Sequence, residues 1–183
     1  MPRIFFGLEP PSEIKERLLN VRGSVPGAKW QSAEQLHITL LFLGGVEESR
    51  LEAVVDSARA IRPTPFELEV SGLGCFGQSR RPRNLWAGVK PEAPVADIHE
   101  ALGQRMEKLG FEAERRSFLP HITLARFKRQ PGSVERLLAE QGASVFGQFA
   151  VTEFALFDSK PGPAGSEYRV IERFPLSGPG ERI

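Results

Sequence analysis

The sequence predicts a mixed protein of helices and strands in which two similar halves pack together. The strongest observation is the tetrapeptide His37–Leu40, which recurs unchanged as His121–Leu124. The order strand, helix, histidine strand, helix, strand can also be read twice along the chain. With 183 residues, of which 40% are hydrophobic and 26% are charged, the chain is suited to one compact globular domain.

The first half begins with an apolar strand over residues 3–8, which a proline pair ends. Ser12 is expected to cap a helix, and a histidine strand over residues 36–43 comes later and ends before two glycines. A second helix is predicted over residues 47–61, and an alternating strand over residues 66–70 closes the half. The apolar stripes of the two helices are Ile14, Leu18 and Val21, and Leu51, Val54, Val55, Ala58 and Ile61.

The second half repeats this order. A strand over residues 85–89 is followed by a helix over residues 94–109, which a glycine ends. The second histidine strand covers residues 121–127, and Pro131-Gly132-Ser133 opens a short helix. A closing strand is predicted over residues 148–157. The apolar positions of the two helices are Val95, Ile98, Leu102, Met106 and Leu109, and Val134, Leu137 and Leu138.

The chain 1–183 is therefore treated as a single domain built from a repeat. Residues 74–84 are its most loop-like stretch and separate halves of about 3–73 and 85–157. Residues 177–183 are rich in Gly, Ser and Pro and are expected to form a loose tail. Two similar units in one short chain favour pseudo-twofold packing, with each histidine strand facing its counterpart across a groove.

Alternation along the first histidine strand separates a core face from a polar face. Ile38, Leu40 and Phe42 share one face and are expected to pack against the helices. His37 and Thr39 share the opposite face, because side chains two residues apart point the same way in a strand. A polar pair on such a face is typical of the wall of a cleft.

In the second copy, His121 and Thr123 are expected to face the same cleft, with Ile122 and Leu124 in the core. Strand alternation places Arg126 on the face opposite His121. This arginine would reach a ligand in the cleft only if the strand twisted or bent there. Otherwise it is a supporting or surface residue.

Two imidazoles and two hydroxyls in matching places are the parts of an acid–base site. Imidazole titrates near pH 6.5, so one ring can be a base while the other is an acid. Such a pair suits in-line displacement at phosphorus, and threonine hydroxyls can donate to its non-bridging oxygens. A single His-x-Thr motif would favour a histidine with a purely structural role, whose hydrogen bonds are satisfied within the fold. The duplication favours a functional role instead, because a fold does not require an imidazole at both His37 and His121. His99 has no counterpart in the other half and is interpreted as a surface or flanking histidine.

Composition and residue spacing argue against several other kinds of site and location. The formal net charge is +1, so attraction for phosphate must come from local clusters such as Arg80-Arg81-Pro82-Arg83. Cys75 is the only cysteine, which excludes an intramolecular disulfide and a thiolate metal cluster. No histidine or carboxylate follows either repeated histidine at zinc-ligand spacing, so no metal is expected. The sequence has neither a signal peptide nor an apolar run of membrane-spanning length, which favours a cytoplasmic protein without membrane contact.

The duplicated motif and its flanks resemble the two-histidine (2H) phosphoesterase superfamily, and within it the LigT-like RNA 2′,3′-cyclic phosphodiesterases, also called the 2′-5′ RNA ligase family. The second motif, Pro120–Arg126, is a close match, and the first is preceded by a tryptophan and followed by Phe-Leu-Gly. The resemblance spans nearly the whole chain. Its other segments are Arg3–Phe6, Trp30, Leu36–Gly44, Phe76, Pro82–Trp86, Ser159 and Tyr168.

This resemblance implies an α+β, bilobal fold, with two pseudo-symmetric sheet-plus-helix lobes that flank a central groove. It implies metal-independent hydrolysis of RNA 2′,3′-cyclic phosphate ends to 2′-phosphates, without a cofactor. The leading hypothesis is therefore a monomeric hydrolase of such ends. His121 would activate water, His37 would protonate the departing 3′ oxygen, and Thr39 and Thr123 would hold the phosphate. The family's ligase label implies possible reverse joining of such an end to a 5′-hydroxyl through a 2′-5′ bond.

Four further residues are expected to bind substrate: Arg126, Phe76, Arg83 and Tyr168. Phe76 could stack on a base, although a core role is as well supported. Two alternative functions stay open. One is a phosphodiesterase acting on another cyclic phosphate, such as a cyclic nucleotide or an ADP-ribose derivative. The other is a non-catalytic module that binds nucleotides or RNA.

Overall fold

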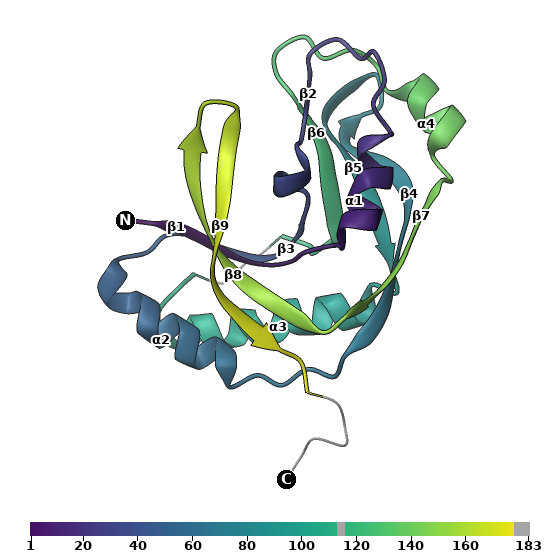
Figure 1. Ribbon diagram of the computed structural model, residues 1–183. Helices are drawn as coiled ribbons and strands as arrows, with labels where there is room; N and C mark the ends of the chain where they lie inside the picture. The colour runs from purple at the N-terminus through teal and green to yellow at the C-terminus, as the bar shows by residue number, and fades with distance from the viewer. Residues whose placement is uncertain (113–115, 178–183) are drawn as a thin grey trace.

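Within residues 1–112 and 116–177, which the computed structural model describes, nine strands form one curved sheet (Figure 1). The strand order is β7-β4-β5-β6-β3-β1-β8-β9. The short strand β2 lies off this path and pairs with residues 125–127 of β6. The strands are β1 (Arg3–Leu8), β2 (Ala28–Trp30), β3 (Ile38–Gly45), β4 (Phe66–Gln78), β5 (Arg81–Lys90), β6 (His121–Phe127), β7 (Val145–Val151), β8 (Glu153–Gly162) and β9 (Gly165–Pro175). The predicted α+β class is confirmed, whereas the finer description as two lobes stays a prediction.

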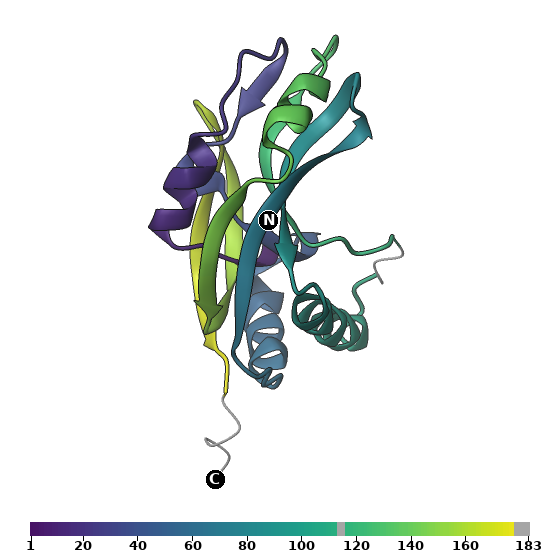
Figure 2. The same cartoon turned by 90° about the vertical axis from the view of Figure 1, so that its right-hand side faces the viewer.

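The helices show how the two halves interlock. α1 (Ser12–Leu19) follows β1 but packs on β7, and α3 (Ala93–Lys108) follows β5 but packs on β3. Each of these helices therefore covers a strand from the other half of the sequence. α2 (Glu48–Arg59) lies beside α3 on one side of the sheet in both ribbon views (Figures 1 and 2). The remaining helical segments are η1 (Ala33–Gln35) and α4 (Glu135–Gln141).

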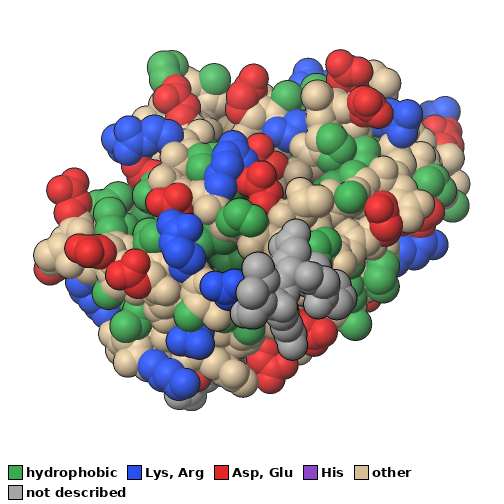
Figure 3. Space-filling view, turned by 60° about the horizontal axis from the view of Figure 1, so that its bottom comes forward, with side chains coloured by type: hydrophobic (Ala, Val, Ile, Leu, Met, Phe, Trp, Pro, Cys, Tyr) green, Lys and Arg blue, Asp and Glu red, His purple; other side chains and the backbone are tan. Residues whose placement is uncertain are grey.

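The face of the molecule that carries α2 and α3 is turned toward the viewer in Figure 3. Acidic and basic side chains are interspersed there with apolar ones, so the visible surface has no large patch of a single charge. The visible face therefore offers no concentrated positive charge to attract a polyanion. This agrees with the formal net charge of +1.

The core lies between the sheet and its helices. Ile38, Leu40, Ile122 and Leu124 are almost completely buried, as the alternation predicts, and they join one continuous apolar cluster. Burying a side chain of this size contributes about 1.5–3 kcal/mol. The single β3–β6 pair, Ile38 opposite Ile122, links the two sides of the sheet. The histidine motifs are therefore adjacent because their apolar residues share this core.

Several predicted boundaries are wrong. Residues 74–84 are not a loop, because β4 and β5 form a hairpin there and pair as far as Gln78 opposite Arg81. Glycine at position 74 is needed because a Cβ would lie 2.4 Å from the ring of Trp86. The predicted strand over residues 148–157 is two strands, separated at Thr152. Strand β9 had no predicted counterpart.

Smaller corrections concern the ends of two elements. Ser12 is the first residue of α1 and not its cap, since Pro11 holds the cap position and no side-chain cap bond forms. The first histidine strand starts at Ile38 and continues through both glycines to Gly45, because Ile4 and Arg3 pair with them. The predicted loose tail, apart from Ser177, lies outside the described residues.

Candidate active site

The repeated tetrapeptides are brought together as a cross-strand square. Because Ile38 pairs with Ile122 in antiparallel register, His37 lies across from Thr123 and Thr39 lies across from His121. All four of these side chains are partly accessible, whereas both isoleucines are buried. The structure therefore places the four predicted polar side chains on one face, as two histidine–threonine pairs.

The backbone fixes how each imidazole points. His37 Nδ1 lies 2.8 Å from the carbonyl oxygen of Gln35, and His121 Nδ1 lies 2.7 Å from that of Leu119. Since a carbonyl oxygen can only accept, we assign the proton to Nδ1 in both neutral rings. Each Nε2 then carries a lone pair. Thr39 Oγ1 donates to His37 Nε2 at 2.8 Å, whereas His121 Nε2 has no hydrogen-bond partner within the described residues.

Nitrogen-15 NMR of the imidazoles is expected to show this tautomer. The chain has three histidines, and His99 Nδ1 also faces a carbonyl oxygen, that of Leu40. Above pH 8, all three rings should show Nδ1 protonated and Nε2 unprotonated. A spectrum in which His37 or His121 carries its proton on Nε2 would contradict the assigned hydrogen bonds.

Burial and charge lower the basicity of both rings. Burial is the main cause that lowers the pKa of His37, to about 4, and the hydrogen bond to Gln35 opposes it only in part. Burial likewise lowers the pKa of His121. The positive charge of Arg126 lowers the pKa of both histidines further. Both rings are therefore neutral at pH 7 in the free protein, and an anion bound between them would raise their pKa values.

A bulge at the leucine of each motif reverses the alternation that follows it. In β3, Phe6 pairs with Leu41 and Gly7 with Thr39, so Leu40 is the extra residue. Both Leu40 and Leu41 are then buried. The prediction that Phe42 packs in the core is wrong, because this ring is 50% exposed.

The same bulge at Leu124 corrects the placement of Arg126. Leu85 pairs with Ala125 and Trp86 with Thr123, so Leu124 is skipped. Arg126 then lies directly across from Asn84, which in turn lies across from Phe76. Directly opposed residues share a face of the sheet, and the ring of Phe76 contacts that of His121 at 5.0 Å. Arg126 is therefore on the histidine face, contrary to simple alternation.

Aromatic rings pack against both imidazoles. The ring centroid of His37 lies 4.8 Å from that of Phe5 and 5.1 Å from that of Tyr168, whose ring is nearly perpendicular to the imidazole. The ring of His121 meets Phe76 nearly at right angles, with Trp86 6.1 Å away. These rigid apolar contacts restrict the imidazoles and also produce the burial that lowers their pKa values.

A pocket of about 360 Å³ opens beside His121. Thr39, His121, Phe76 and Arg83, all predicted from the sequence, line it together. Phe42, which is predicted to lie in the core, and His99, which is interpreted as a surface or flanking histidine, line it as well. Tyr168 lies away from this pocket, against His37. The repeat could have indicated that Phe42 lies near the site. Phe42 lies five residues after His37, just as Arg126 lies five residues after His121.

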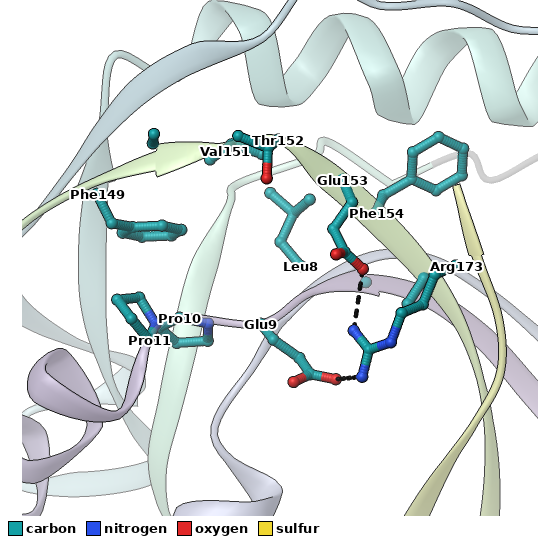
Figure 4. Close-up of a pocket in the computed structure, with 13 residues that line it drawn as sticks. Leu8, Glu9, Pro10, Pro11, Phe149, Val151, Thr152, Glu153, Phe154 and Arg173 are labelled. Atoms are coloured by element: carbon teal, nitrogen blue, oxygen red, sulfur yellow. Dashed lines mark hydrogen bonds and ion pairs between the residues drawn. The ribbon is translucent and has the colours of Figure 1, made fainter. Parts of the chain in front are cut away.

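A second hollow, of about 420 Å³, lies at the end of β1 (Figure 4). Its cation, Arg173, bonds to Glu153 at 2.9 Å and approaches Glu9 at 3.6 Å. Two carboxylates against one guanidinium disfavour a phosphate group there. Although this hollow has the larger volume, the pocket beside His121 is the candidate site, because it is the one lined by the predicted acid–base residues Thr39 and His121.

Within the described part of the chain, no group of three histidine, cysteine, aspartate or glutamate side chains is placed to hold a metal ion. No described helix is both long enough and apolar enough to cross a membrane.

Comparisons with known proteins show the family to which the sequence is similar. The sequence model described as LigT like Phosphoesterase matches residues 8–86 and 89–168. An RNA 2′,3′-cyclic phosphodiesterase of Archaeoglobus fulgidus is 31% identical over 94% of this chain and 99% of its own length. A protein of the same name from Thermotoga maritima is 34% identical, over 91% of this chain and 88% of its own.

Solved structures give the same answer for the fold. The crystal structure of TT0787 of Thermus thermophilus superposes with a TM-score of 0.82 at 30% identity, covering 97% of this chain and 99% of that one. Crystalline E. coli LigT complexed with 3′-AMP superposes with a TM-score of 0.78 at 26% identity, covering 96% and 98%. Further structures of that protein hold ATP and NADP+.

Proposed function

This chain belongs to the LigT-like phosphoesterase family, and we propose that it hydrolyses RNA 2′,3′-cyclic phosphate ends through an acid–base pair formed by His37 and His121. The observation that carries the proposal is the square of two histidines and two threonines on one face of the sheet. Relatives that are 31% and 34% identical over most of the chain are named for this activity.

In the proposed reaction, the cyclic phosphate lies between the two imidazoles. The free Nε2 of His121 takes a proton from water, and the oxygen of that water forms a bond to phosphorus. The bond from phosphorus to O3′ breaks in line, and Nε2 of His37 gives its proton to O3′. The product keeps a 2′-phosphate. The negative charge of the substrate supports this role for His37, since it raises the pKa that burial lowers in the free protein.

The threonines and Arg126 are proposed to stabilise the negative charge on the phosphate oxygens. Thr39 Oγ1 already reaches His37 Nε2, so a small rotation would direct its proton to a non-bridging oxygen instead. Thr123 occupies the matching place across from His37. Arg126 supplies a permanent positive charge to the histidine face, as its effect on both imidazole pKa values indicates.

The pocket beside His121 is proposed to receive the nucleoside. Phe42 and Phe76 present aromatic faces there, and Arg83 stands exposed at its rim. Phe42 also has the guanidinium of Arg3 5.3 Å from its ring centroid. Tyr168, on the other side of His37, is proposed to border the phosphate rather than the base. Arg80, by contrast, faces Glu135 at 4.0 Å outside the pocket.

The same two histidines are proposed to support the reverse joining reaction. There a 5′-hydroxyl would replace water, give its proton to His121 and bond through its oxygen to phosphorus. The bond from phosphorus to O3′ would break, His37 would protonate O3′, and the retained bond to O2′ would leave a 2′-5′ linkage. The protein is also proposed to act as a monomer, because every residue assigned to the site comes from one chain.

Phosphorus NMR on a panel of cyclic phosphates tests the proposal. A 2′,3′-cyclic phosphate oligonucleotide should be opened to the 2′-phosphate alone, and turnover should continue in EDTA. A 3′-phosphate product would contradict protonation of O3′. Faster turnover of a 3′,5′-cyclic nucleotide or of an ADP-ribose cyclic phosphate would identify a different substrate class, and tight binding without turnover would indicate a binding module.

A further inference from the structure

The bulges in the two histidine motifs are stabilised in different ways. In the second motif, the carbonyl oxygen of Leu124 accepts a hydrogen bond from the backbone N–H of Gln31 at 2.9 Å. In the first motif, the matching carbonyl oxygen of Leu40 accepts one from His99 Nδ1 at 2.6 Å. A side chain from α3 therefore does for one motif what the backbone does for the other. From the sequence alone, His99 is interpreted only as a surface or flanking histidine.

The surroundings of His99 hold its ring in that position. The ring stacks on Phe118 with centroids 4.0 Å apart and planes only 5° from parallel. Its neighbour Ile98 and the following Leu102 are buried in the core, which anchors this part of α3. A ring fixed on one face and anchored at its backbone has little freedom to move away from the Leu40 carbonyl.

We propose that His99 is a positioning residue for the reaction: by holding the Leu40 bulge, it sets the direction of Thr39 and Phe42 on either side of it. Thr39 precedes the bulge and bonds His37 Nε2, and Phe42 reaches the pocket only because the bulge reverses the alternation. His99 acts through the backbone of β3, although its ring also lines the pocket. The inference rests on the proposed function, since its kinetic consequence is read from hydrolysis of a cyclic phosphate.

Three variants test this proposal. His99→Leu removes the donor and should lower kcat roughly tenfold, because the Leu40 carbonyl loses its partner and Thr39 is no longer held. His99→Asn places an amide N–H where Nδ1 stood and should keep at least a third of wild-type kcat. His99→Gln places its amide nearer the position of Nε2 and should behave like the leucine variant. KM on 2′,3′-cyclic CMP should rise in the leucine and glutamine variants, because Phe42 lines the pocket proposed to receive the nucleoside.

Nitrogen-15 NMR of the two remaining histidines gives a readout independent of activity. In His99→Leu and His99→Gln, the His37 ring signals should shift because the contact with Thr39 changes. Asp97→Asn, an exposed change on the same helix, is the matched control and should not alter the His37 signals. If His99→Leu does not fold, the asparagine and glutamine variants decide the question.

Two outcomes would overturn the role of His99. One is full activity and unchanged His37 signals in the folded leucine or glutamine variant. The other is equal loss of kcat in the asparagine and glutamine variants at equal melting temperature. Absence of turnover in the wild-type protein would instead contradict the proposed function, and the NMR comparison would still test the contact between His99 and β3.

Discussion

Replacing either His37 or His121 by alanine is expected to reduce kcat on a 2′,3′-cyclic phosphate by roughly 10²–10⁴-fold, the usual contribution of one acid–base group. Each imidazole serves a different oxygen, so neither can replace the other. The two groups act as a unit, and the double variant should therefore lose much less than the product of the two single losses. Stopped assays with phosphorus NMR detection would measure all three rates.

The unfolding free energy of His37→Ala, measured over a range of pH, checks that this variant folds. The folded-state pKa of His37 lies below the value of about 6.5 expected for the unfolded chain. Its contribution to stability is therefore fully present above pH 6.5 and is lost as the pH falls toward 4. His37→Ala lacks this loss, so its unfolding free energy relative to wild type should improve between pH 7 and pH 4.5. Activity within tenfold of wild type in either folded variant would rule out the acid–base assignment.

The repeat made the central part of this site predictable. His37 and His121 occupy the same place in two identical tetrapeptides, and the alternation within each tetrapeptide correctly separates polar from buried residues. What alternation could not predict is the extra residue at Leu40 and Leu124, because a bulge changes neither composition nor apolar spacing at the point where it occurs. The error was therefore confined to the residues that follow, Phe42 among them.

The hairpin of β4 and β5 was missed for a different reason. Glycines at positions 72, 74 and 77 look like loop residues in the sequence, and two of them have positive φ angles. In the structure, Gly74 instead gives room to the ring of Trp86 from the next strand. Such a cross-strand contact is visible only once the register of the two strands is known.

Arg126→Gln is expected to lower kcat/KM by roughly 10²–10³-fold, comparable to the loss of one oxyanion donor in acyl-transfer enzymes. It should also move the pH optimum upward. A reaction that needs one protonated and one neutral imidazole is fastest between their two pKa values. Both values lie below the ordinary 6.5, so the wild-type kcat/KM should peak below pH 6.5 and fall as the pH rises further.

Because the charge of Arg126 lowers the pKa of both histidines, its removal raises both and shifts the whole profile to higher pH. Arg126→Lys separates the two effects, since a lysine keeps the charge but loses the planar fork that binds two phosphate oxygens. The lysine variant should therefore lose rate while keeping an acidic optimum. If the glutamine and lysine profiles coincide, the guanidinium does not set the histidine pKa values. Should glutamine leave the rate unchanged as well, Arg126 faces the groove without taking part in the reaction.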